Sequence, residues 1–124
     1  MDIINRNQVS AFITKDTSTI REILAPRNSF IERQSLAEAS LPSGTVTLSH
    51  SHPETEEIYY ILQGSALMAI ENERREIGVG DAVAIPAGKR HQIKNIGPED
   101  LVFLCCCVPA YSDEDTVFCD SLFN

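Results

Sequence analysis

All three histidines of this chain lie in two short segments that each begin with a glycine, and the first segment also carries a glutamate at metal-ligand spacing. The first segment, residues 44–64, reads GTVTLSHSHPETEEIYYILQG, and the second, residues 80–95, reads GDAVAIPAGKRHQIKN. Three imidazoles and a carboxylate form a donor set that suits a first-row divalent metal and leaves positions open for substrate. The four candidate ligands are His50, His52, Glu57 and His91.

The first two histidines belong to an expected strand at residues 45–51 and its end. His50 and His52 are two residues apart, so their side chains point to the same face of that strand. Val46 and Leu48 share this face, which we therefore assign to the core. The opposite, outward set is polar: Thr45, Thr47, Ser49 and Ser51.

The other two candidate ligands belong to later strands. Glu57 shares parity with Tyr59 and Ile61 on the next expected strand, which an antiparallel pairing can place beside the histidine pair. His91 begins a strand just after the turn Pro-Ala-Gly at residues 86–88. A rigid turn at that point can deliver the imidazole to the mouth of a barrel.

From residue 34 onward, short apolar runs alternate with turns rich in glycine and proline, which indicates an all-β sandwich or barrel. About eight strands in this length fit a double-sheet jelly roll. The first thirty residues contain two apolar runs, residues 9–13 and 19–24, that fit either short strands or a helical turn. The expected strands are residues 35–41, 45–51, 57–62, 66–70, 74–79, 82–85, 91–95 and 101–108.

A length of 124 residues fits one domain. The net charge of −8 argues against binding nucleic acid or an anionic membrane through a basic surface. The first ten residues have no signal-peptide pattern, and the apolar runs are too short to span a membrane. Four cysteines match no zinc-finger or disulfide pattern, so we expect reduced thiols and a cytoplasmic protein.

The two histidine segments resemble the two motifs of the cupin family. The first matches glycine, five residues, His-x-His, four residues, glutamate, six residues and glycine. The second matches glycine, five residues, Pro-x-Gly, two residues, histidine, three residues and asparagine. The matching residues are Gly44, His50, His52, Glu57 and Gly64 in the first motif and Gly80, Pro86, Gly88, His91 and Asn95 in the second.

This resemblance implies a single-domain cupin with an all-β, double-stranded β-helix (a jelly-roll barrel). We expect N-terminal strands or an arm at residues 1–32, the conserved barrel at 33–110 and a C-terminal tail at 111–124. The resemblance also implies one divalent metal per subunit (Mn, Fe, Ni, Co or Zn), bound by His50, His52, Glu57 and His91. Because the imidazoles must be neutral to bind, metal should be lost below a pH of roughly 6.

Several further residues are candidates for the pocket. Tyr59 lies on the Glu57 face and is our candidate catalytic residue, because its phenol could donate a proton or hydrogen bond to substrate. Gln34 and Glu38 are possible inward residues, and Lys89 with Arg90 is a possible anion-attracting pair; a core or solvated role is the alternative for each. In the strand at residues 101–108, either the alternate set with Cys105 and Cys107 or the set with Cys106 lines the barrel. We expect the cysteines to act in packing, because no base or cation accompanies them.

We expect a metal-dependent enzyme acting on a small molecule, namely an oxidoreductase of the dioxygenase type. One alternative is an isomerase or cyclase of a sugar or small carbonyl compound, since compact relatives are often labelled as resembling phosphomannose isomerase. The lack of an inward arginine or lysine cluster argues against a sugar-phosphate substrate. The other alternative is a non-catalytic small-ligand binding or sensor protein. The run at residues 58–62 is apolar on both faces, so we also expect a homodimer.

Overall fold

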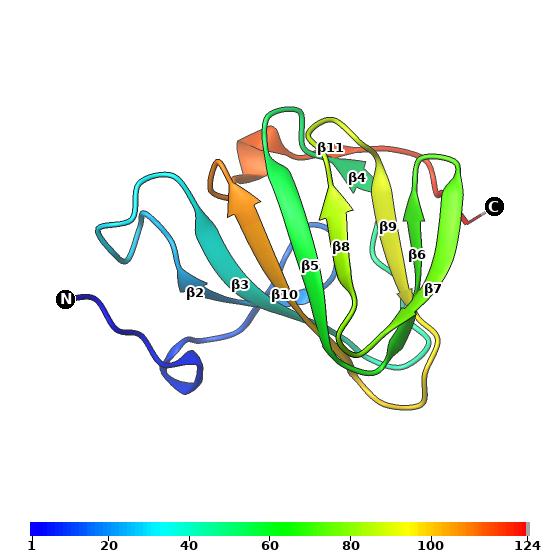
Figure 1. The fold of residues 1–124 in the computed structure, drawn as a ribbon, viewed down its shortest axis with the longest axis horizontal. Coiled ribbons are helices and arrows are strands. Elements are labelled where there is room, and N and C mark those ends of the chain that lie inside the picture. Colours follow the sequence, from blue (N-terminus) through cyan, green and yellow to red (C-terminus); the bar gives the residue numbers. More distant parts are fainter. Residues whose placement is uncertain (124) are drawn as a thin grey trace.

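The computed structural model describes residues 1–123 as two antiparallel β-sheets with short connections (Figure 1). The six-stranded sheet has the order β1-β2-β3-β10-β5-β8, with bounds Phe12–Ile13, Thr19–Leu24, Ser35–Leu41, Leu101–Val108, Glu56–Gln63 and Ala82–Ile85. The five-stranded sheet has the order β11-β4-β9-β6-β7, with bounds Val117–Phe118, His50–Ser51, His91–Asn95, Ser65–Ile70 and Glu73–Gly78. The predicted all-β jelly roll is confirmed.

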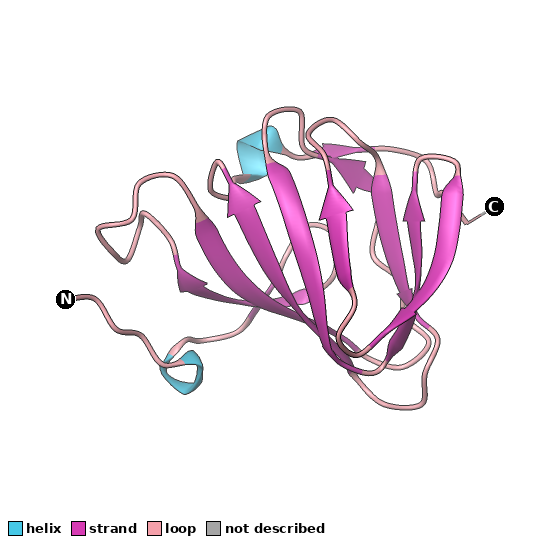
Figure 2. Ribbon diagram, viewed as in Figure 1, coloured by secondary structure: helices cyan, strands magenta, loops and turns pink. Residues whose placement is uncertain are grey.

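Helical structure among residues 1–123 is limited to two short 3-10 helices, η1 at Arg6–Gln8 and η2 at Asp113–Asp115 (cyan in Figure 2). None of the described helices is long and apolar enough to span a membrane. The ambiguous run at residues 19–24 forms strand β2, and only the last two residues of the run at 9–13 form a strand, β1. The hairpin of β1 and β2 extends the edge of the six-stranded sheet beside β3.

The expected strand at residues 45–51 is much shorter than predicted. Within residues 45–51, only His50–Ser51 (β4) forms a regular strand, and Val46 makes an isolated bridge to Lys94. The predicted faces were also wrong, since Val46 and Leu48 are 39% and 48% exposed whereas Thr47 and Ser49 are buried. The C-terminal segment covers the side of this segment that carries Ser49. There the amide of Cys119 donates a hydrogen bond to the carbonyl of Ser49.

The core lies between the two sheets and follows the alternation of the long strands. In β5, Glu57, Tyr59 and Ile61 are buried while Ile58, Tyr60 and Leu62 are 49%, 42% and 43% exposed. Strand β10 alternates in the same way, so that Leu101, Phe103, Cys105 and Cys107 point inward. Of the two alternate sets of side chains on this strand, the set with Cys105 and Cys107 therefore lines the barrel.

Two motif residues stabilise the turns at the end of the barrel away from the histidines. Gly64 has φ +90°, and a Cβ there would lie 3.2 Å from both the Asp100 carbonyl oxygen and the Leu101 Cα. Asn95 is fully buried; its Nδ2 donates to the carbonyls of Leu41 and Glu99, and its Oδ1 accepts from the amide of Gly97. Both residues therefore hold the connections of the barrel.

Candidate metal centre

The structure brings the three histidines together at one end of the barrel. His50 begins β4, His52 follows that strand, and His91 begins β9, where it lies directly opposite His50 in the antiparallel register. The ring centroids of His50 and His91 are 4.3 Å apart, and those of His50 and His52 are 5.0 Å apart. One ring nitrogen from each of the three lies within 4.8 Å of the others, so this group could hold a metal ion.

Each imidazole is oriented by a backbone carbonyl. His50 Nδ1 lies 2.9 Å from the carbonyl oxygen of Leu48, and His91 Nδ1 lies 3.0 Å from that of Lys89. His52 Nδ1 lies 3.1 Å from the carbonyl oxygen of Asp115, which belongs to η2. A protonated Nδ1 that donates to a carbonyl leaves Nε2 unprotonated and free to bind a metal.

Glu57 reaches the same space from β5 in the opposite sheet. Its Oε1 lies 3.5 Å from His52 Nε2 and 3.4 Å from His91 Nε2. Its Oε2 accepts from the Cys107 thiol at 3.2 Å. Oε1 and His91 Nε2 are both buried without a hydrogen-bond partner. A cation bound between these two facing atoms would satisfy both of them.

The pKa values of these groups follow from burial and from their proximity. Burial opposes ionisation of Glu57, but the nearby His52 and His91 imidazoles outweigh it and lower its pKa to about 2. Burial also acts against protonation of His52, yet Glu57 and Asp115 raise its pKa above the ordinary value. His50 differs, because burial and the neighbouring His91 lower its pKa. The site therefore holds an ionised carboxylate beside imidazoles of unequal basicity.

A cavity of about 50 Å³ adjoins His50 and His52, and its lining includes residues of the N-terminal hairpin and of the C-terminal segment. Tyr59 lines it, is buried, and stacks edge-on against His91 at 5.9 Å between ring centroids. Burial raises the pKa of the Tyr59 phenol well above its usual value, so the group is a neutral donor. Tyr111, from the C-terminal segment, packs edge-on against His52 at 5.7 Å.

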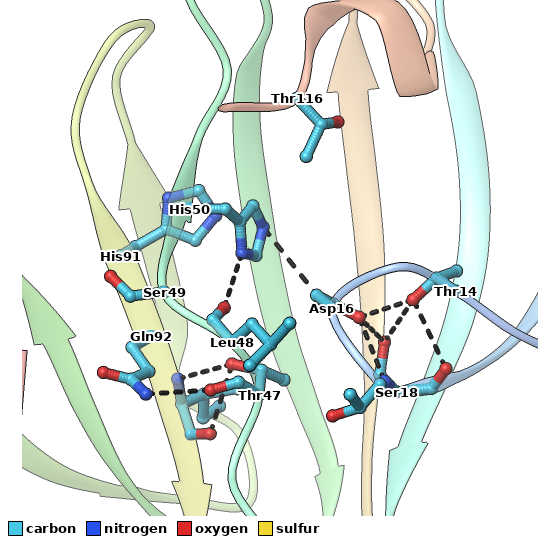
Figure 3. Close-up of polar contacts among 12 residues, drawn as sticks. Thr14, Asp16, Ser18, Thr47, Leu48, Ser49, His50, His91, Gln92 and Thr116 are labelled. Carbon is cyan, nitrogen blue, oxygen red and sulfur yellow. Dashed lines mark hydrogen bonds and ion pairs between the residues drawn. The ribbon is translucent and has the colours of Figure 1, made fainter. Parts of the chain in front are cut away.

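Asp16 also faces the site, and its role was not foreseen from the sequence (Figure 3). It lies in the turn between β1 and β2, and its Oδ2 is 3.9 Å from His50 Nε2. Asp115 was missed too; its carboxylate accepts from the amides of Glu54 and Thr55 and so fixes the loop after His52. Asp16 lies in a polar turn and Asp115 in a short polar 3-10 helix, and an aspartate in such a segment usually indicates only a turn or a cap.

The two histidine motifs of residues 44–95 lie within the part of the chain that matches a known family. A family model described as "Cupin domain" matches residues 37–107. The chain belongs to the cupin family. This cupin is 49% identical over 110 residues to the uncharacterized protein MJ1618 of Methanocaldococcus jannaschii, which covers 89% of this chain and 88% of that protein.

Two solved structures share the fold of this cupin. A "predicted oxalate decarboxylase" from Thermotoga maritima matches with a TM-score of 0.77 at 23% identity, covering 87% of this chain and 99% of that one. The polyketide cyclase RemF from Streptomyces resistomycificus also matches with a TM-score of 0.77 at 23% identity, covering 93% of this chain and 89% of that one. At such low identity these likenesses show the fold alone.

Several predicted pocket residues of the cupin lie elsewhere. Glu38 points outward and pairs with Arg6 at 2.8 Å, while Gln34 is exposed, because the inward face of β3 carries residues 35, 37, 39 and 41. Arg90 pairs with Glu71 at 2.8 Å, and neither Arg90 nor Lys89 lines the cavity. Val46 and Leu48, which we expected on the core face, are exposed and do not line the cavity either.

Proposed function

We propose that this cupin is a divalent-metal-dependent enzyme that acts on a small organic molecule as an oxidoreductase of the dioxygenase type. The observation that carries the proposal is the convergence of three imidazoles and the orphaned Glu57 Oε1 beside a cavity. The ligands proposed are His50, His52, Glu57 and His91. A first-row metal held there supplies Lewis acidity and, if redox-active, the capacity to activate dioxygen.

The surrounding residues have separate roles in this proposal. The Cys107 thiol occupies Glu57 Oε2 and so presents Oε1 to the histidines. Phe103 packs against the Tyr59 ring at 4.7 Å and fixes it, which leaves the phenol able to donate a hydrogen bond to substrate. Phe12, Phe103 and Tyr111 give the cavity wall an aromatic surface that excludes water.

A cyclase or isomerase is the second candidate, favoured by two protic groups on the cavity wall. The Tyr59 phenol and the Asp16 carboxylate provide a donor and an acceptor, which is the equipment needed to relocate a proton without oxygen. The polyketide cyclase RemF shares this fold, which supports the second candidate. Oxygen dependence separates the two candidates.

The test is turnover by protein loaded separately with Fe(II), Mn(II), Ni(II), Co(II) or Zn(II), with and without oxygen. The proposal expects one redox-active metal to support oxygen uptake on a panel of small organic molecules, and His91→Ala to abolish it. Turnover that persists in the absence of oxygen would favour the cyclase or isomerase. If none of the organic molecules in the panel is converted, the result would favour the non-catalytic binding protein.

We also propose that a second copy of the chain covers the outer face of the six-stranded sheet. There the exposed Tyr60 lies between Leu104 of β10 and Ala82 of β8, and Ile58 lies between Cys106 and Ala84. This unbroken apolar patch is uncharged at its centre, so the same patch on a symmetric partner can pack against it.

Light scattering tests the dimer. We expect a mass of twice 13.7 kDa for the wild type, loss of the dimer in Tyr60→Glu and no change in Val79→Glu, a matched change at another exposed apolar residue. A monomeric wild type at micromolar concentration would contradict the proposal.

A further inference from the structure

The turn that carries Asp16 is built to hold one carboxylate oxygen toward the histidines. Its Oδ1 accepts hydrogen bonds from the hydroxyls of Thr14 and Ser18, the latter at 2.6 Å, and from the Ser18 amide at 3.0 Å. The other oxygen, Oδ2, is the one that faces His50 Nε2 (Figure 3). With three donors on one oxygen, the carboxylate has little freedom to rotate away from the cavity.

This turn is also attached to the strand that carries His50. The Leu48 amide donates to the Asp16 carbonyl at 2.9 Å, and the Thr17 hydroxyl donates to the Val46 carbonyl at 3.5 Å. Leu48 in turn accepts from His50 Nδ1, so Asp16 and His50 hold their relative positions through one shared residue. The Asp16 side chain is only 16% exposed. Asp16 is therefore a fixed part of the cavity wall and not a surface charge.

The cavity contains no positive side chain to offset this charge. Of the 18 described residues that line it, none is lysine or arginine, and three are acidic: Asp16, Glu22 and Glu57. Glu22 is neutralised by an ion pair with Arg27. Glu57 faces the proposed metal through Oε1. Asp16 is thus the remaining acidic group that a substrate beside His50 would meet.

We propose that Asp16 offsets the charge of the metal and so shifts this site toward neutral or cationic substrates that donate a hydrogen bond, such as alcohols, phenols, amides or amines, and away from carboxylates and phosphates. The inference rests on the proposed metal-dependent function and specifies its substrate class. A substrate hydroxyl or amino group beside His50 can donate to Asp16 Oδ2. An anionic group in the same place meets a like charge, which weakens its binding on the order of 10- to 100-fold in a partly solvated protein site.

Acetate and acetamide provide the test, because they are nearly isosteric and differ in charge and in donor capacity. Their dissociation constants are measured on Mn(II)-loaded protein by water-proton relaxation, after metal content and thermal unfolding have been checked for each variant. The informative quantity is the ratio of acetate affinity to acetamide affinity. We expect Asp16→Asn to raise this ratio by about 10- to 100-fold. Glu22→Gln, a matched change at the paired lining carboxylate, should alter it less than about threefold.

Asp16→Ala serves as a second variant in case the asparagine of Asp16→Asn disturbs the contacts with Ser18. It must raise the ratio of acetate affinity to acetamide affinity as well. A ratio in both Asp16 variants that stays within about threefold of the wild type would overturn the inference while leaving the metal site intact. A wild-type protein that binds no divalent metal would instead refute the proposed function, and the substrate inference would fall with it. Metal content, measured first, separates these two failures.

Discussion

In the metal-free protein, ionised Glu57 should contribute to the free energy of unfolding, and this contribution should be lost at acidic pH. Burial opposes its ionisation, but His52 and His91 outweigh burial and lower its pKa from 4.5 to about 2. A pKa lower in the folded state stabilises the fold above the unfolded value and loses that effect as pH falls toward the folded value. At about 1.4 kcal/mol per pH unit, the difference amounts to on the order of 3 kcal/mol, lost between pH about 5 and 2.

Urea denaturation of chelator-treated wild type and Glu57→Gln measures this component. The other carboxylates titrate in both proteins, so they cancel when the two free energies of unfolding are subtracted at each pH. We expect the advantage of the wild type to shrink by on the order of 3 kcal/mol between pH 6 and 2.5. If both proteins lose stability in parallel over this range, the described electrostatics of the histidine and glutamate cluster are wrong.

Three further substitutions give distinct expectations. Asn95→Ala removes three hydrogen bonds, two buried and one partly buried, and should cost about 2–4 kcal/mol in urea denaturation without changing metal content. Gly64→Ala places a Cβ 3.2 Å from the Asp100 carbonyl oxygen at φ +90° and should cost about 1–3 kcal/mol, whereas Gly78→Ala, which meets nothing within 4 Å, should be near neutral. Tyr59→Phe should keep the bound metal and lower turnover by about 10²- to 10⁴-fold; full turnover would assign Tyr59 to packing alone.

The strand order along the chain could be predicted because turns and alternation are local properties. The ends of β3, β8, β9 and β10 coincide with the predicted runs, since glycine and proline mark the connections between them. The faces of residues 45–51 could not be predicted. They depend on the C-terminal segment, which covers Ser49 and whose Leu122 amide donates to the Gln92 side chain.

The proximity of the four candidate ligands could be predicted from the spacing of the two motifs, although strand parity misassigned the faces of residues 45–49. The approach of Asp16 and Asp115 could not be predicted, because one lies in a turn and the other in a 3-10 helix, and both contact the histidine segment only through the tertiary fold. Likewise, the backbone carbonyls that orient the three imidazoles follow from loop conformation and leave no signal in the sequence. Local patterns thus identify the donors, whereas tertiary contacts determine how they are oriented and what surrounds them.

We propose that His50, His52, Glu57 and His91 together bind one divalent metal. Elemental analysis of protein purified without added metal tests it directly, with His52→Ala as the altered site and circular dichroism as the check on folding. We predict about one divalent first-row metal per wild-type chain and a loss of most of it in His52→Ala. A folded His52→Ala protein with unchanged metal content, or a wild type that takes up none when metal is supplied, would contradict the account.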